Sequence, residues 1–118
     1  MPLHEYNIAA SFKAICENAT AALFVIDAKQ QCIYANPAAE TLTGFKAREL
    51  IGQRLHDLIH HSRPDGSKYP ISECPLDSGL PANSREQGEE IFVHADGSFY
   101  PVSYTSSPII EDGNLVGK

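Results

Sequence analysis

Three histidines and a cysteine that could bind a metal ion gather in the middle of the sequence. His56 and His60 are four positions apart, so a helix here would present both imidazoles on one face. His61 adjoins them, and Cys74 follows in the same region, so the nitrogen and sulfur donors that suit zinc or haem iron are present. A His-x-x-x-His pair without a glutamate in catalytic register arises readily by chance. We therefore favour solvated or hydrogen-bonded histidines over a metal site.

Nucleophilic catalysis finds little support in the sequence. It needs an activated serine or cysteine beside a positioned base, and the chain has no Gly-x-Ser-x-Gly motif, glycine-rich phosphate loop or kinase motif. We therefore do not expect this protein to be an enzyme.

Charge and cysteine usage narrow the class of protein further. The chain has nine basic and fifteen acidic residues and a net charge of −6. The basic residues form no stripe along the sequence, so we expect no direct binding to nucleic acid. The three cysteines have no regular spacing and predict reduced thiols rather than disulfides. The longest apolar run, residues 21–26, is too short to span a membrane, and the N-terminus lacks a signal-peptide pattern. These features predict a cytoplasmic protein without a membrane partner.

Hydrophobic spacing predicts an amphipathic helix near the N-terminus and several brief helices in the middle. The apolar stripe of the first helix consists of Ile8, Phe12 and Ile15. A second helix begins at Asn36-Pro37, a favoured cap followed by a favoured first position, and ends near Gly44. Three further short helices are expected, over residues 49–52, 55–60 and 72–80.

Runs rich in β-forming residues predict strands over residues 21–27, 32–35, 90–94 and 99–106. Asp96-Gly97 between the last two predicts a hairpin with a type I′ turn, which has positive φ at both central positions. Asp27 and Asn36, which flank the first pair of strands, are expected to close a turn and cap a helix rather than contact a ligand. A turn at residues 111–114 precedes the start of another strand, residues 115–118. The order of elements predicts an α+β fold with helices on one face of an antiparallel sheet.

Six fragments of the sequence occur in the order and spacing of PAS sensory domains. They are residues 24–27, 33–40, 43–45, 49–52, 96–98 and 107–109. No fragment is specific alone, but six in register are hard to attribute to chance, and the chain resembles this family of bacterial signalling domains.

The resemblance implies a five-stranded antiparallel sheet in spatial order 2-1-5-4-3, with short helices on one face and a ligand pocket between. The fifth strand, which is central in that sheet, is represented only by residues 115–118, so we expect it to be truncated. The chain then divides into an N-terminal amphipathic helix, residues 1–20, and a PAS sensory domain, residues 21–118.

The function implied is that of a sensory input module of a larger signalling protein, either a histidine kinase of a two-component system or a helix-turn-helix transcription regulator. We expect the module to bind a small molecule, to form a homodimer, and to act on an output domain that these residues do not include. One alternative is a PAS domain that binds nothing and serves only as a dimerisation adaptor. Another is a small metal-binding protein that uses His56, His60, His61 and Cys74.

The resemblance also bears on cofactors. Flavin-binding relatives carry a reactive cysteine in an Asn-Cys-Arg-Phe type of motif on the helix that corresponds to residues 55–60, where this chain has no cysteine. Haem-binding relatives place their histidine on the later helix, near residues 72–80, where this chain has none. Flavin and haem are both disfavoured, and the ligand stays unidentified.

The alternation of a strand fixes which side chains of residues 101–106 share a face. We assign Val102, Tyr104 and Ser106 to the inner face because Val and Tyr are the bulkier packing pair, which leaves Pro101, Ser103 and Thr105 outside. The remaining pocket lining is predicted to be Phe24, Ile26, Leu42, Phe45, Leu58 and Leu76. Core packing would explain each of these positions as well as ligand contact does.

Overall fold

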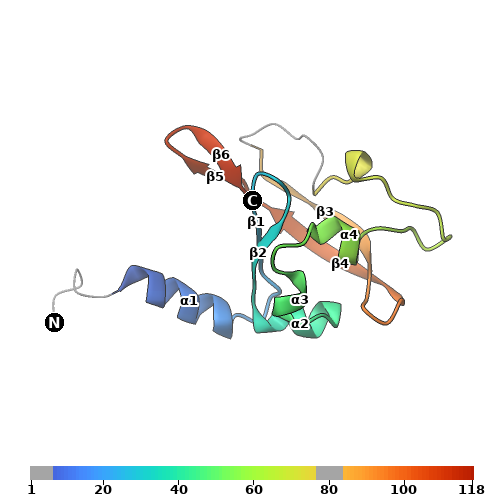
Figure 1. The fold of residues 1–118 in the computed structure, drawn as a ribbon, viewed down its shortest axis with the longest axis horizontal. Helices are drawn as coiled ribbons and strands as arrows, with labels where there is room; N and C mark the ends of the chain where they lie inside the picture. Colours follow the sequence, from blue (N-terminus) through green and yellow to red (C-terminus); the bar gives the residue numbers. More distant parts are fainter. Residues whose placement is uncertain (1–6, 77–83) are drawn as a thin grey trace.

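The computed structural model describes residues 7–76 and 84–118. Figure 1 shows α1 projecting from a body in which short helices lie beside three hairpins. The elements are α1 (Ile8–Asn18), β1 (Phe24–Ile26), β2 (Cys32–Ala35), α2 (Pro37–Thr43), α3 (Ala47–Leu50), α4 (Leu55–Ile59), the 3-10 helix η2 (Ile71–Glu73), β3 (Glu86–Val93), β4 (Phe99–Ser106), β5 (Ile109–Glu111) and β6 (Asn114–Gly117). The α+β class predicted from the sequence is confirmed.

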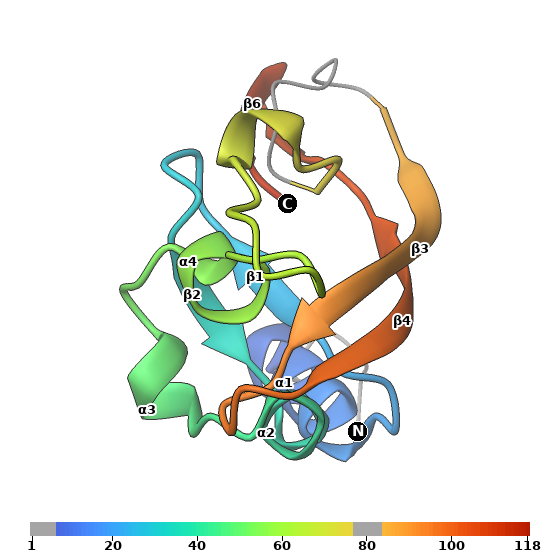
Figure 2. The same ribbon diagram turned by 90° about the vertical axis from the view of Figure 1, so that its right-hand side faces the viewer.

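Three antiparallel pairs, β1–β2, β3–β4 and β5–β6, make up the strands. The end of β6 lies against β1, where Ile26 and Lys118 exchange backbone hydrogen bonds of 2.8 and 2.9 Å. On its other side β6 pairs with β5, which follows β4 along the chain (Figure 1). The last strand thus lies beside the first strand, as the order 2-1-5-4-3 requires. In the described part of the chain no ladder joins β6 to β4, so the strands form three separate pairs rather than the continuous five-stranded sheet that was expected, and the sheet is open between β1 and β4 (Figure 2).

The turn between β3 and β4 differs from the predicted type I′ turn. Only Gly97 has a positive φ, of 89°, whereas Asp96 does not. The Gly97 amide donates to the His94 carbonyl at 2.8 Å, and the His94 amide donates to the Ser98 carbonyl at 2.7 Å. The loop therefore has three residues, a type I turn followed by a left-handed glycine, which is the usual solution for this loop length. Two successive positive φ angles occur instead at Asp112-Gly113, between β5 and β6.

The core is a small cluster beneath the first hairpin. Its buried members are Cys32, Ala35, Ala39 and Leu50, and the half-buried side chains packed against it include Phe24, Phe45, Leu55 and Leu58. The predicted helices at 49–52 and 72–80 are less regular than expected. The first is α3, which lies slightly earlier in the chain, and the second starts as the single 3-10 turn η2, while residues 77–80 lie outside the described residues.

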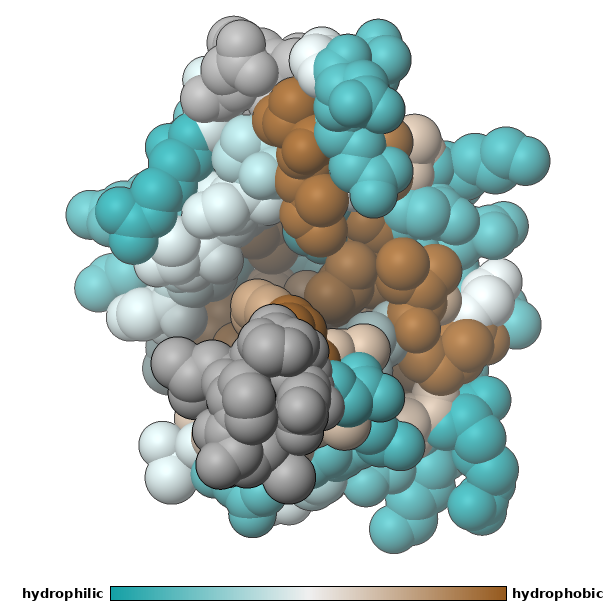
Figure 3. Space-filling model, turned by 90° about the vertical axis from the view of Figure 1, so that its left-hand side faces the viewer, coloured by the Kyte–Doolittle hydropathy of each residue, from teal (hydrophilic) through white to brown (hydrophobic). Residues whose placement is uncertain are grey.

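Helix α1 forms as predicted but carries no buried residue. Its apolar stripe is open to solvent, with Ile8, Phe12 and Ile15 being 62%, 64% and 67% exposed. Figure 3 views the molecule from the side on which α1 projects and shows a band of hydrophobic residues across this face. None of the described helices is both long enough and apolar enough to cross a membrane.

Candidate functional site

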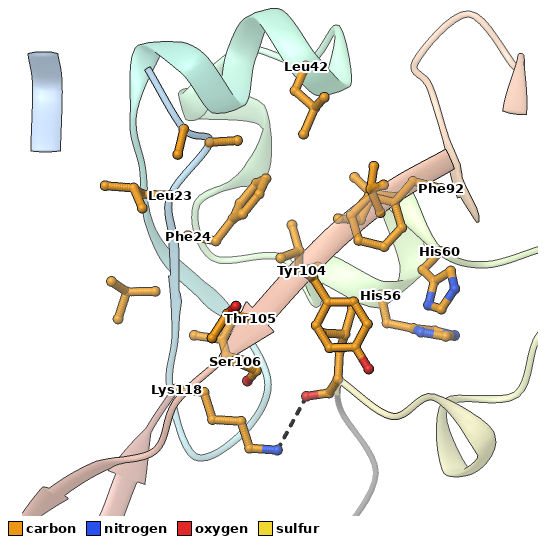
Figure 4. Close-up of a pocket in the computed structure, with 18 of the residues that line it drawn as sticks. Leu23, Phe24, Leu42, His56, His60, Phe92, Tyr104, Thr105, Ser106 and Lys118 are labelled. Carbon is orange, nitrogen blue, oxygen red and sulfur yellow. Dashed lines mark hydrogen bonds between the residues drawn. The ribbon is translucent and has the colours of Figure 1, made fainter. Parts of the chain in front are cut away.

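A cavity of about 820 Å³ lies between β1 and β4 (Figure 4). Its walls are mostly apolar, with residues 21–26 on one side and residues 101–107 on the other. Helix α2 contributes Leu42, helix α4 contributes Leu55 and Ile59, and β3 contributes Phe92. Within the described residues no ladder joins the strands on the two sides of this space.

Seven of the nine residues predicted to line a pocket do line this cavity. They are Phe24, Ile26, Leu42, Leu76, Val102, Tyr104 and Ser106. The other two, Phe45 and Leu58, do not line it; they pack against the core cluster under the first hairpin. Leu58 fails because α4 turns that position toward the cluster while His56, Ile59 and His60 face the cavity. Contact of any of the seven with a ligand stays a prediction.

The alternation on β4 follows the predicted faces. Val102, Tyr104 and Ser106 are half-buried, whereas the residues between them are exposed. Tyr104 lies opposite Gly88 of β3, whose missing side chain leaves room for the phenol ring. Burial raises the pKa of Tyr104, and the neighbouring Glu90 and Glu86 carboxylates raise it further, so the phenol is neutral and can donate a hydrogen bond. Pro101, Ser103 and Thr105, which were predicted to lie outside, also line the cavity although they are exposed. The predicted inner face is therefore correct for burial, but the prediction that only this face meets the cavity is wrong.

Sequence reasoning missed a cation at the lower end of the cavity. The Lys118 ammonium group donates to the carbonyl of Leu76 at 3.3 Å across the cavity (Figure 4). This contact joins residues 42 positions apart, and no local pattern in the sequence signals it. The cavity therefore has hydroxyl groups in its wall and a positive charge at one end.

A polar cluster forms the part of the wall that α4 contributes. His60 lies between two partners, with Nδ1 3.1 Å from Sγ of Cys74 and Nε2 3.1 Å from Oε2 of Glu90. His56 donates from Nε2 to the backbone carbonyl of Tyr69 at 2.7 Å. The Tyr69 hydroxyl donates to Oε1 of Glu90 at 3.2 Å, and burial together with this carboxylate raises the pKa of Tyr69 to about 12. The cluster is therefore closely hydrogen-bonded.

The structure brings together three of the four donors considered from the sequence. His56, His60 and Cys74 are buried side by side. His61 is exposed and lies outside the group, with Nδ1 2.7 Å from the hydroxyl oxygen of Ser62. The i, i+4 spacing placed the two clustered histidines on one helix face, but only the fold could bring Cys74 to them.

Comparison with known proteins places this arrangement in a family. A model of the PAS fold matches residues 10–117. A PAS domain from Colwellia psychrerythraea is 23% identical, with a TM-score of 0.75 over 94% of this chain and 91% of that one. The PAS domain of nitrogen regulation protein NR(II) from Vibrio parahaemolyticus is 27% identical, with a TM-score of 0.65 over 88% of this chain and 89% of that one. An RNA-binding light-oxygen-voltage receptor is 21% identical, with a TM-score of 0.77 over 99% of this chain and 32% of that one. The family match spans nearly all of the described residues, so the chain belongs to the PAS family.

Proposed function

We propose that this chain is a sensory input module that binds a small, largely apolar molecule in the cavity between β1 and β4. The observation that carries the proposal is the cavity itself, since about 820 Å³ falls within the range of small-molecule sites. Its apolar walls supply most of the binding free energy, and the hydroxyl groups of Tyr104 and Ser106 orient a polar group of the ligand. The similarity to the PAS domain of a nitrogen regulation protein supports a role in signalling.

A ligand in this position would contact two hairpins that no ladder joins. One side of the cavity belongs to β1 and the other to β4, so an occupant would link the two. Binding would then favour one relative placement of the hairpins by its differential affinity for the alternatives. We propose that this shift is passed, through a homodimer, to an output domain of the parent protein, either a histidine kinase or a transcription regulator.

The first test asks what the freshly purified chain retains. Native mass spectrometry with an absorbance scan would detect a bound metabolite, and the fluorophore anilinonaphthalene sulfonate would report the apolar cavity. We expect Val102→Phe, which adds volume on the inner face of β4, to reduce fluorophore binding and displace any retained ligand. The matched control is Val116→Phe, at an exposed position of β6 outside the cavity.

Two results would contradict the proposal. One is equal fluorophore binding by the original chain, Val102→Phe and Val116→Phe. The other is a chain that arrives without any small molecule and gains no thermal stability from any member of a metabolite library, which would favour the ligand-free dimerisation adaptor.

A further inference from the structure

The polar cluster on α4 has the geometry of a metal site as well as of a hydrogen-bonded network. One donor atom from each of His56, His60 and Cys74 lies within 4.8 Å of the other two. Tetrahedral zinc bonds of about 2.0–2.3 Å place neighbouring nitrogen and sulfur ligands about 3.5 Å apart. Sγ of Cys74 and Nδ1 of His60 are already 3.1 Å apart. The His60–Cys74 pair is thus close to the required separation, and the donor atom of His56 lies within 4.8 Å of both.

The Nε2 atoms of His56 and His60 make the hydrogen bonds that are usual for metal-binding histidines. Nε2 of His56 bonds to the Tyr69 carbonyl, and Nε2 of His60 bonds to the Glu90 carboxylate. A carbonyl or carboxylate oxygen can only accept here, so Nε2 carries a proton, and in the neutral ring the lone pair is then on Nδ1. Histidines that bind metals typically donate their second ring N–H to a carbonyl or carboxylate in this way, which fixes the ring orientation.

We propose that His56, His60 and Cys74 form a binding site for a zinc-class divalent ion, with Nδ1 of each histidine and the Cys74 thiolate as ligands. Two imidazoles and one thiolate suit a borderline-soft ion such as Zn²⁺ and suit Mg²⁺ or Ca²⁺ poorly. The thiolate and the Glu90 carboxylate behind His60 supply negative charge that offsets the ion. Three protein ligands leave one position of a tetrahedral ion open, and both histidines line the main cavity. The ion would thereby add a polar anchor to the wall of the ligand cavity.

Cobalt is the probe that reports both the ion and the thiolate. The full chain is treated with chelator and titrated with Co²⁺, and Zn²⁺ is then added as competitor. We expect one equivalent of Co²⁺ per chain, tetrahedral d–d bands, and a thiolate-to-cobalt charge-transfer band that Zn²⁺ abolishes. Cys74→Ser should lose the charge-transfer band, and His60→Gln should weaken cobalt binding at least about tenfold.

Neighbouring groups of the same type provide the controls. His61→Gln removes the adjacent imidazole outside the cluster, and Cys16→Ser removes a thiol on α1; both should bind as the original chain does. If Cys74→Ser fails to fold by circular dichroism, X-ray absorption of the zinc-loaded original chain should show one sulfur among the ligands. A coordination shell without sulfur, or a charge-transfer band that is absent from the original chain or unchanged in Cys74→Ser, would overturn the proposal.

Discussion

Asn36 shows how much one side chain can organise in this fold. Its carbonyl oxygen accepts from the amides of Leu23 and Ala39 at 2.9 and 3.0 Å. Its amide nitrogen donates to the carbonyls of Cys16 and Ala21 at 2.9 and 3.0 Å. This one buried residue thus caps α2 and also ties α1 and the start of β1 to it, which goes beyond the capping role predicted from the sequence.

We expect Asn36→Ala to lower the free energy of unfolding by about 2–4 kcal/mol, because it removes a cap and leaves several buried backbone groups unpaired. Urea denaturation followed by circular dichroism would measure the change. Asn18→Ala is the control, since its side chain makes one exposed hydrogen bond on α1. A loss below about 1 kcal/mol would mean that water replaces the lost contacts.

Ser106 tests the ligand cavity with little change in packing. Its hydroxyl lies on the half-buried face of β4 among apolar neighbours, so its removal deletes a polar contact but hardly alters the volume. Ser106→Ala should weaken binding of whatever small molecule native mass spectrometry identifies by about 0.5–1.5 kcal/mol, with folding nearly intact. Isothermal titration calorimetry would measure this, with Ser11→Ala on α1 as control. Unchanged affinity would remove Ser106 from the site.

Tyr100 carries a buried hydroxyl for which the described residues provide no hydrogen-bond partner. Burial raises its pKa, so the folded state holds the phenol proton more tightly than the unfolded chain does. The ionisation of Tyr100 therefore leaves the free energy of unfolding unchanged below the ordinary tyrosine pKa of about 10 and lowers it as pH rises from there through the higher folded pKa.

Tyr100→Phe should remove part of this alkaline loss and raise the free energy of unfolding near neutral pH by about 1 kcal/mol. Urea denaturation at neutral pH and at a series of alkaline pH values would show both effects. Tyr6→Phe, near the N-terminus, serves as the control for loss of a phenol. Destabilisation by Tyr100→Phe would show that water or another group satisfies the hydroxyl.

At the scale of elements, the β3–β4 turn depends on one backbone angle. Gly97 has φ of 89°, and a side chain there would meet open space, so a substitution is resisted by the backbone conformation alone. We expect Gly97→Val to destabilise the fold by about 1–3 kcal/mol. Gly97→Asn is the matched variant and should cost less, because Asn tolerates the left-handed region. Equal denaturation midpoints for glycine, asparagine and valine at this position would contradict the turn assignment.

The elements themselves were largely predictable because their signals are local. Stripe periodicity, the Asn36-Pro37 start and the Asp96-Gly97 turn identified α1, α2 and the β3–β4 hairpin, whereas β5 was not predicted. The prediction of a type I′ turn between β3 and β4 was wrong. A two-residue loop and a three-residue loop can both contain Asp-Gly, and only the register of the two strands distinguishes them. Leu58 was misplaced because each face of the short α4 meets an apolar surface, so hydrophobicity alone could not choose between the core cluster and the cavity.

The candidate site is formed by residues far apart in the sequence, so local sequence patterns could not predict which of them lie together. Cys74 contacts His60 although the two residues are fourteen positions apart in the sequence. Glu90 of β3 contacts the same histidine from thirty positions away. Lys118 enters the cavity from the last strand. The sequence shows which donor residues are present. The packing of α4 against β3 and of β6 against β1 determines which of these donors contact one another.

The exposed stripe of α1 bears on how complete molecules associate. An isolated helix of 11 residues is marginal in water, yet none of the described residues covers the apolar side chains of α1. A second copy would supply a matching stripe through a two-fold axis, so we expect a homodimer that buries Ile8, Phe12 and Ile15.

Phe12→Glu should therefore shift the chain toward monomer and lower its melting temperature, because a carboxylate would be buried in the apolar contact. Light scattering at about 50 μM would measure the mass, at a concentration that populates even weak dimers. Ala14→Glu adds the same charge at an exposed position of α1 away from the stripe and should leave the dimer intact. If the original chain is a monomer at this concentration and Phe12→Glu changes neither mass nor melting, α1 does not mediate self-association. A monomer produced equally by both variants would mean that general charge repulsion, and not loss of the stripe, separates the copies.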